Sequence, residues 1–170
     1  MSVLVLVAPG SEEIETVAIV DTLVRGGIDV VLASCCPTGA RQIRASRGVQ
    51  LVADCHLDEL TTRDFDAMVV PGGLPGSEVI RDTPLAIDLL REQAGLGRWR
   101  AAICAAPAVV LHHHGLLGDA STTCHPGFQA RLPATQLSTA RVVTDEAHRL
   151  ITSQGPGTAI EFALEILRVL

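Results

Sequence analysis

Short apolar runs alternate with helical patterns along the whole chain. Residues 3–7 form a continuous apolar run, which is typical of a strand buried on both faces of a sheet. Further strands are predicted at residues 29–33, 67–70, 101–103, 141–143 and 150–152, and a hairpin is predicted at 45–52. The first predicted helix begins at residues 10–11 and ends at 26–27, and further helices are predicted over 84–94, 105–112 and 159–170. This alternation predicts an α/β fold with a parallel sheet wrapped by helices.

The first predicted helix is apolar around more than one stripe of the helical wheel. One face can pack on the sheet, and the remaining apolar surface needs another cover. A loop of the same chain and a subunit interface explain the pattern equally well. The apolar positions are Ile14, Val17, Ala18, Ile19, Val20, Leu23 and Val24.

The 170 residues contain no repeat and no linker, which predicts a single domain over residues 1–170. The net charge of −6 argues against nucleic acid as the main partner, because affinity for DNA or RNA comes largely from basic side chains on phosphates. Three Phe, one Trp and no Tyr also leave few rings for stacking on bases.

All 13 basic side chains are arginines, because the chain has no lysine. Without an ε-amine there can be no Schiff-base aldolase and no pyridoxal-phosphate enzyme. A Walker-A phosphate loop is excluded by the same absence. Covalent catalysis on a carbonyl group would therefore have to use sulfur.

The apolar run at residues 3–8 is too short for a signal peptide and has no basic flank. No stretch approaches the roughly 18 apolar residues of a membrane span. The five cysteines are an odd number without a C-x-x-C pair, which favours free thiols over a disulfide framework. We therefore expect a cytoplasmic protein without a membrane partner.

Cys104 follows a predicted strand and precedes a predicted helix, with Ala102 and Ala106 two residues to either side. This is the arrangement of a nucleophile elbow, in which small residues permit a sharp turn from strand to helix. A thiol at a helix start is expected to have a lowered pKa, because the helix dipole favours the thiolate. The alternative is an inert core cysteine, and the local pattern leaves both open.

Two further features are expected at the same edge of the sheet. Residues 71–73, Pro-Gly-Gly, follow a strand, so their backbone N–H groups could approach an oxyanion or simply form a tight turn. Glu15 lies one turn into the first helix among apolar neighbours. A carboxyl buried there would have a raised pKa and could act as acid or base, whereas the alternative is a surface glutamate like Glu12 and Glu13.

Several histidines and cysteines are metal ligands in type but not in spacing. Consecutive helix residues point about 100° apart, so a run of three histidines cannot face one ion, and a solvated helix end is expected instead. A site formed by Cys104, Cys124 and His125 is a weaker alternative, and no metal is predicted. The runs concerned are 112–114, 35–36 and 55–56.

Four segments occur in order along the chain: Ala-Pro-Gly-Ser-Glu-Glu-Ile-Glu (8–15), Pro-Gly-Gly (71–73), Ala-Ala-Ile-Cys-Ala-Ala-Pro (101–107) and Thr-Ser-Gln-Gly-Pro-Gly-Thr-Ala (152–159). Together they resemble the ThiJ/PfpI superfamily, specifically the DJ-1 group and its bacterial YajL-like branch. The resemblance covers essentially the whole chain, and only the combination of the four is specific.

The resemblance implies a flavodoxin-like α/β sandwich, with a mostly parallel central sheet and helices on both faces, that works as a homodimer through its first helix. It implies Cys104 as a reactive thiolate at a strained elbow, hydrogen-bonded by a protonated Glu15. Bacterial members continue for a further helix beyond Leu170, so the edge of the expected dimer departs from theirs. The other implied site positions are Gly73 and Ala105 for the oxyanion pocket, His125, Arg25 and Arg47 around it, and Gly155 and Pro156 in a loop over the thiol.

Ala105 separates the activities that the resemblance implies. Peptidase-like relatives carry a histidine base directly after the cysteine, and an alanine offers no base, so peptidase activity is not expected. The expected function is glyoxalase III-like conversion of methylglyoxal to lactate, or the related deglycase activity, with no metal or organic cofactor. The alternative is an oxidative-stress sensor or redox-regulated chaperone that acts through oxidation of Cys104.

Overall fold

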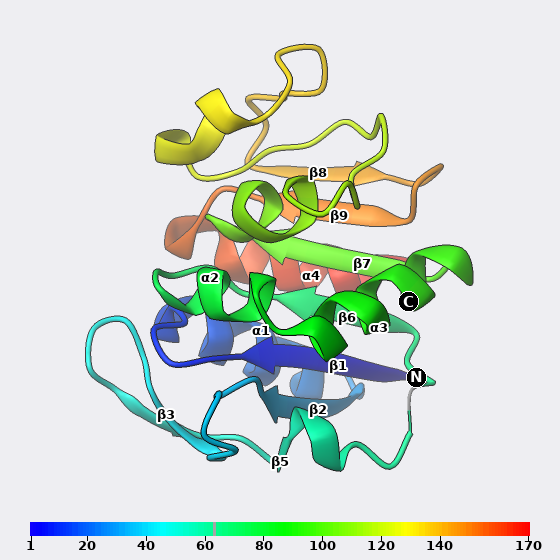
Figure 1. The fold of residues 1–170 in the computed structure, drawn as a ribbon. Helices are drawn as coiled ribbons and strands as arrows, with labels where there is room; N and C mark the ends of the chain where they lie inside the picture. The colour runs from blue at the N-terminus through cyan, green and yellow to red at the C-terminus, as the bar shows by residue number, and fades with distance from the viewer. Residues whose placement is uncertain (63) are drawn as a thin grey trace.

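The centre of the structure is a seven-stranded sheet in the order β5-β2-β1-β6-β7-β9-β8 (Figure 1). This computed structural model describes residues 1–62 and 64–170. Neighbouring strands are parallel except β8, which pairs antiparallel with β9. The strands are β1 (Ser2–Val7), β2 (Asp29–Ser34), β5 (Cys55–His56), β6 (Ala67–Val70), β7 (Trp99–Ile103), β8 (Val142–Asp145) and β9 (Leu150–Ser153).

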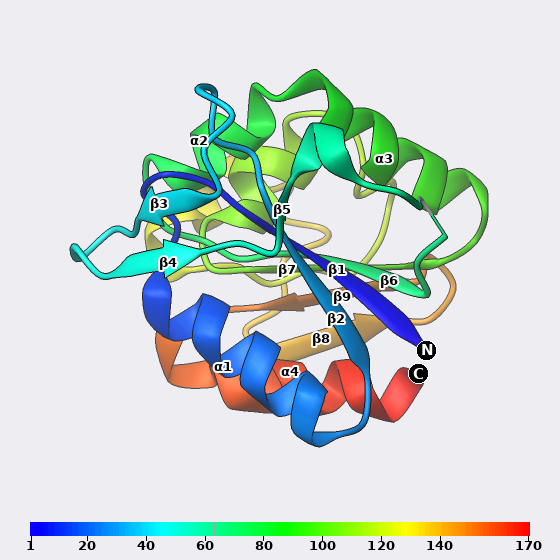
Figure 2. The same ribbon diagram turned by 90° about the horizontal axis from the view of Figure 1, so that it is seen from below.

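Helices cover both faces of this sheet (Figure 2). Helices α1 (Glu13–Arg25) and α4 (Ala159–Val169) lie side by side on one face. The other face is covered by α2 (Gly76–Arg81), α3 (Pro84–Gly95) and the π-helix η2 (Pro107–His112). The predicted flavodoxin-like sandwich is therefore confirmed.

Strand β1 shows why a continuous apolar run marks the sheet centre. Leu4 and Leu6 pack into the core on the side of α2 and α3, whereas Val3 and Val5 pack into the core on the side of α1 and α4. All four side chains are completely buried. Because successive strand residues point to opposite faces, a strand covered on both sides must be apolar at every position.

The hairpin forms earlier in the chain than predicted. It consists of β3 (Gln42–Arg44) and β4 (Gln50–Val52), so residues 45–49 are its turn rather than its first strand. Polar residues occupy both ends of β3, and only Ile43 is buried, so the strand has almost no apolar signal. Also unpredicted were β5, α2 and three short 3-10 helices: η1 (Leu57–Glu59), η3 (Pro126–Arg131) and η4 (Pro156–Thr158).

The helix after Cys104 differs from the predicted 105–112 in its start and its type. It begins at Pro107 and has π geometry. Cys104 and Ala105 form a turn before it, and proline lacks an N–H, which suits the first position of a helix. The elbow is therefore separated from the helix by a turn.

The apolar surface of α1 divides into a covered and an uncovered part. Ile19 and Leu23 are completely buried against the sheet. Ile14, Val17 and Val24 are each more than half exposed. Cover by a loop of the same chain is therefore the wrong explanation for these three residues, and the subunit interface stays a prediction. Separately, none of the helices within the two described ranges is long and apolar enough to cross a membrane.

Candidate active site

The predicted site residues gather at the carboxyl ends of the central strands, where ligands of open α/β sheets bind. Cys104 directly follows β7, and Gly72 and Gly73 follow β6. Glu15 comes from the first turn of α1, which follows β1, and Gly155 follows β9. Four strands that are adjacent in the sheet thus deliver these residues to one edge.

Cys104 sits at a strained turn. Its φ of 65° is in the left-handed region, which non-glycine residues seldom occupy. Two backbone hydrogen bonds hold it there, because its N–H donates to Ser153 O at 2.9 Å and its carbonyl accepts the N–H of His125 at 2.9 Å. The residue is 9% exposed and lines a cavity, so only a small part of it can be reached by a ligand.

Glu15 is completely buried, so the interpretation as a surface glutamate is wrong. Its Oε2 accepts the backbone N–H of Gly72 at 2.7 Å. Its Oε1 is buried and has no partner of regular hydrogen-bond geometry in the described part of the chain. The carboxyl therefore keeps one oxygen available for the thiol beside it.

Glu12 and Glu13 are not surface residues either, because each is less than 10% exposed. The carboxylate of Glu12 caps α1 by accepting the N–H of Glu15 at 2.7 Å. The carboxylate of Glu13 accepts the hydroxyl of Ser46 and the N–H of Arg47, both at 2.8 Å. These contacts join the hairpin turn to the first turn of α1.

The Glu15 carboxyl and the Cys104 thiol shift each other's pKa. Burial raises the pKa of Glu15 to about 7, against the opposing effect of the Gly72 N–H group. Burial, followed by the charge of Glu15, raises the pKa of Cys104 to about 12, although the N–H groups of Gly73 and Ala105 act to lower it. The prediction that a helix start lowers the pKa of this thiol is therefore wrong, because burial beside a carboxylate outweighs any dipole.

These two pKa values describe a pair that shares a proton. Two negative charges in one buried site repel strongly, so the pair loses its first proton near pH 7 and its second only near pH 12. Between these values the pair carries one proton and one negative charge. Such a pair can deliver a proton and a nucleophile to the same substrate.

Because Gly72 has no side chain, Cys104 and Glu15 can lie close to each other and to the backbone of this residue. A Cβ atom at Gly72 would lie 2.5 Å from the Cys104 Cβ and 2.8 Å from the Glu15 Oε2. Gly73, with φ of 90°, packs equally closely on the loop before α1. Backbone can therefore approach the pair where any side chain would push it apart.

The cavity above Cys104 has a volume of about 440 Å³. His125 and Arg47 are exposed at this cavity, and the Nδ1 of His125 accepts the N–H of Gly127 at 3.1 Å. Gly155 lies beside the pair, since a Cβ there would be 3.9 Å from both the Cys104 Sγ and the Glu15 Oε1. The lining consists of Glu12, Ile14, Ser46, Arg47, Gly73, Leu74, Cys104, Ala105, His125, Phe128 and Pro156.

Arg25 is the one predicted site residue that lies neither in the lining of this cavity nor beside the Cys104–Glu15 pair. It ends α1 and pairs with Asp21 at 2.8 Å, far along the helix from Glu15. Its implied role depends on a second copy of the chain and stays a prediction.

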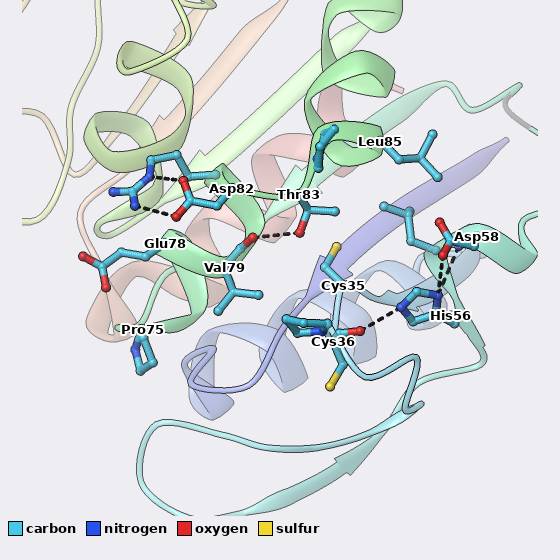
Figure 3. Close-up of a pocket in the computed structure, with 14 residues that line it drawn as sticks. Cys35, Cys36, His56, Asp58, Pro75, Glu78, Val79, Asp82, Thr83 and Leu85 are labelled. Atoms are coloured by element: carbon cyan, nitrogen blue, oxygen red, sulfur yellow. Dashed lines mark hydrogen bonds and ion pairs between the residues drawn. The ribbon is translucent and has the colours of Figure 1, made fainter.

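A larger cavity of about 810 Å³ lies between the loop after β2 and the α2–α3 junction (Figure 3). The His56 Nε2 is 3.0 Å from the carbonyl of Cys36, and Arg81 forms an ion pair with Asp82. Figure 3 shows the Cys35 sulfur pointing into the cavity and the Cys36 sulfur pointing away from it. Burial raises the pKa of Cys35 to about 12, so the thiol that faces this cavity is held neutral.

The histidines and cysteines outside this site are of residue types that can bind a metal. Within the described ranges, no three His, Cys, Asp or Glu side chains form a group that could hold a metal. The histidine run 112–114 is only partly the solvated end that was expected, because the His114 Nε2 lies 2.8 Å from the carbonyl of Arg81.

Sequence reasoning missed Phe128, Ser46 and Glu13 as parts of this site. Phe128 stands on the short helix η3, which has no periodic signal. Ser46 and Glu13 meet across 33 residues, a separation that local patterns do not report. The available hint was the position of Ser46 directly before Arg47.

Comparison with known proteins gives a consistent result. The profile of the DJ-1/PfpI family matches residues 1–169. Protein DJ-1 homolog B of Arabidopsis thaliana is 42% identical over 165 residues, which are 97% of this chain but only 37% of the length of that relative. The glutathione-independent glyoxalase DJR-1.2 of Caenorhabditis elegans is 36% identical over 173 residues, covering 99% of this chain and 88% of that protein.

A solved structure of oxidized DJ-1 from Toxoplasma gondii superposes with a TM-score of 0.94 at 42% identity. The match covers 99% of this chain and 89% of that chain. The strand order and the helices on both faces are therefore those of a known architecture.

Proposed function

This chain belongs to the DJ-1/PfpI family, and from that premise we propose that it converts small α-oxoaldehydes, such as methylglyoxal, into 2-hydroxy acids, such as lactate. The observation that carries the proposal is the buried Glu15 carboxyl beside the Cys104 thiol, with a pKa raised to about 7. A relative named a glutathione-independent glyoxalase adds support. Assignment to the bacterial YajL-like branch stays a prediction, because the relatives described above are eukaryotic.

The first step is addition of the Cys104 sulfur to the aldehyde carbon. The S–C bond forms as the carbonyl π bond breaks, and the aldehyde oxygen takes the proton that the pair shares, which gives a hemithioacetal. The N–H groups of Gly73 and Ala105, which interact with the sulfur, are placed to stabilise the developing oxyanion.

The second step moves a proton between the two carbons of the dicarbonyl unit. Glu15, now a carboxylate, takes the C–H proton, and the electron pair forms a C=C bond as the ketone π bond breaks, which gives an enediolate. Glu15 then returns the proton to the former ketone carbon, while the hydroxyl proton on the former aldehyde carbon passes to the former ketone oxygen and the C=O bond of the thioester forms. The product is a thioester of the 2-hydroxy acid. The aldehyde carbon has been oxidised and the ketone carbon reduced, so the electrons balance within the substrate.

Water completes the cycle by attacking the thioester carbon. The C–S bond breaks, the hydroxy acid leaves, and the sulfur regains its proton. The same thiol would act on adducts of methylglyoxal with amines and thiols, which is the deglycase activity. The methyl side chain of Ala105 supplies no base, so peptidase activity is not part of the proposal.

Lactate formation from methylglyoxal tests the proposal. We expect Cys104→Ser to lower kcat/KM by at least about 10³-fold, because the hydroxyl is a poor nucleophile without a dedicated base. The matched control is Cys36→Ser, at a thiol hydrogen-bonded to Thr38 and remote from the cavity, which should keep most of the activity. Equal turnover by wild type and Cys104→Ser would reject the enzyme.

The second candidate is a sensor or redox-regulated chaperone that responds to oxidation of Cys104. The observation in its favour is the buried Glu15 Oε1, which has no partner of regular hydrogen-bond geometry among the described residues and could hydrogen-bond an oxygen added to the sulfur beside it. Peroxide would supply each oxygen and leave as water. Mass spectrometry should then find two added oxygens on Cys104 alone, and oxidation spread over all five thiols would exclude the sensor.

We infer that the chain forms a homodimer through the exposed side chains of α1. Ile14, Val17 and Val24 form an apolar surface that the described residues leave uncovered. Ile14 also lines the cavity, so such an interface would border the site. Light scattering should give twice the chain mass of 17.9 kDa, and a monomer mass would contradict the inference.

A further inference from the structure

The cavity above Cys104 is larger than the reacting unit of its proposed substrate. Pockets of roughly 300–1,000 Å³ bury drug-sized ligands, and this cavity has a volume of about 440 Å³. The dicarbonyl unit that reacts needs only the part next to Cys104. Methylglyoxal, which adds a single methyl group to that unit, would leave most of the cavity to water.

The lining of this cavity combines polar groups with several large apolar side chains. The thiol of Cys104 and the N–H groups of Gly73 and Ala105 form the reacting end. The large apolar side chains of the lining are Ile14, Leu74, Phe128 and Pro156, which we call the apolar wall. Ile14 is 58% exposed and Leu74 is 44% exposed, and apolar groups exposed around a hollow are typical of a binding site for an apolar group.

Phe128 is held in a fixed position on this wall. Its ring meets the His125 ring edge to face, with centroids 6.1 Å apart, and the guanidinium of Arg131 lies 5.0 Å from its centroid. The segment is tied to the nucleophile, because the His125 N–H donates to the carbonyl of Cys104. The other two phenylalanines, Phe65 and Phe162, are completely buried in the core.

The charged side chains of the lining do not favour a substrate of one particular charge. Glu12 and Arg47 both line the cavity and carry opposite charges. The property that can separate one α-oxoaldehyde from another is therefore the apolar wall.

We propose that the preferred substrate carries an aryl or bulky alkyl group on its ketone carbon, and that Phe128 and Leu74 determine this preference. The inference rests on the proposed function and keeps its chemistry, in which an aryl-CO-CHO and one water give an aryl-CH(OH)-COOH. The apolar group would leave water for the wall, while the dicarbonyl unit stays at Cys104. One methylene in an apolar pocket changes kcat/KM by about 10- to 200-fold, so a phenyl group should give a measurable preference.

The test compares phenylglyoxal with methylglyoxal as substrates of the full chain. Initial rates are taken at pH 7, and mass spectrometry checks that Arg47 stays unmodified, because both reagents also attack arginine. We expect the wild type to favour phenylglyoxal in kcat/KM by at least about tenfold. Phe128→Ala should lower this selectivity ratio by about tenfold, and Leu74→Ala should lower it by a smaller factor.

Two further variants control for misfolding of Phe128→Ala and for the loss of an exposed leucine outside the cavity. Phe128 also contacts the core, so Phe128→Leu keeps an apolar side chain there and should give an intermediate ratio, with thermal denaturation as the check of folding. Leu96→Ala is the matched control for Leu74→Ala, because Leu96 is also exposed, at 56%, but lies outside the cavity lining. This control should leave the ratio unchanged.

A second readout does not depend on turnover. Iodoacetamide and N-benzyl-iodoacetamide both alkylate thiols, and their rates on Cys104 are each divided by their rates on glutathione. The wild type should favour the benzyl reagent by about tenfold, and Phe128→Ala should lose this preference.

The two readouts separate the failure of this inference from the failure of the proposed function. Turnover of both dicarbonyls with equal kcat/KM would overturn the inference and leave the function standing. Absence of turnover with a retained benzyl preference would reject the glyoxalase and support the apolar wall as a ligand-selecting surface. Absence of both would overturn both.

Discussion

The cavity above Cys104 and the larger cavity beside Cys35 contain similar residue types but differ in how the polar groups are hydrogen-bonded. In the larger cavity, His56 contacts a carbonyl, Arg81 pairs with Asp82, and the Thr83 hydroxyl donates to Val79 O. Beside the smaller cavity, Glu15 is completely buried, and its Oε1 has no regular hydrogen-bond partner in the described part of the chain. The thiol next to it belongs to a residue with a strained φ. The two cavities are therefore distinguished by an incompletely satisfied titratable pair rather than by their volumes, and such a pair is the expected mark of a functional site.

The thiols of Cys36, at the larger cavity, and Cys104, at the smaller cavity, also differ in pKa and in access. Although burial opposes it, hydrogen bonds from the hydroxyl and N–H of Thr38 and from the N–H of Ala40 lower the pKa of Cys36. This sulfur nevertheless points away from the larger cavity (Figure 3). Cys104 has a raised pKa but faces a cavity together with a proton donor. A low pKa without access and a partner does not make a catalytic site.

The largest expected effect is on activity, from removing one carboxylate next to each cavity in turn. Glu15→Gln should lower kcat/KM for methylglyoxal by about 10²- to 10⁴-fold, because the amide cannot move a proton between the carbons. Glu78→Gln, in the larger cavity, should change it by less than about twofold. Lactate assays decide this, and equal losses in the two variants would remove the distinction between the cavities.

The next effect is on the pH dependence of stability. Glu15 loses its proton near pH 4.5 when unfolded but near pH 7 when folded, so its stabilising contribution is full below pH 4.5 and lost as pH rises through 7. Between pH 4 and pH 8 the wild type should lose about 3 kcal/mol of unfolding free energy relative to Glu15→Gln. Urea denaturation at the two pH values measures this difference.

Glu13→Gln supplies a control of opposite sign. Although burial opposes it, hydrogen bonds from backbone N–H groups and the Ser46 hydroxyl lower the pKa of Glu13. Its stabilising contribution is therefore present above its ordinary pKa and lost as pH falls. The same sign in both variants would contradict the assignment of Glu15 as the desolvated carboxyl.

A smaller effect is expected from filling the space at the active pair. Gly72→Ala places a methyl group against Cys104 and Glu15 and should cost about 1–3 kcal/mol, with loss of activity. Gly95→Ala is the matched control, because nothing lies within 4 Å of its Cβ and the residue ends α3. It should be neutral or stabilising by up to about 1 kcal/mol. Thermal denaturation and lactate assays of both variants check this, and an active, stable Gly72→Ala would contradict the close packing.

The smallest effect is expected in the larger cavity. His56→Ala removes the contact with the Cys36 carbonyl and the cap of η1, which should cost about 1 kcal/mol of stability. Turnover of methylglyoxal should not change. A loss of activity larger than the loss of folded protein would show that this cavity takes part in the reaction.

The sequence patterns predicted six of the seven strands of the central sheet but missed β5 at one edge, and they misplaced the first strand of the separate hairpin, β3. Apolar runs at β1, β6 and β7 are strong signals because these strands are buried on both sides. Strands β3 and β5 are only three and two residues long and include polar positions, so their pairing partners, rather than their own residues, make them strands.

The amino-acid sequence alone determined the sheet centre and the chemistry that is possible. Because the chain has no lysine, sulfur is the predicted covalent nucleophile, and the small residues around Cys104 predicted its elbow. Only the tertiary structure decided how the nucleophile titrates. Glu15, Gly72 and Cys104 come from separate parts of the chain, and their pKa values depend on mutual burial. Local patterns report which residues are available, whereas desolvation and charge coupling arise only when the fold brings them together.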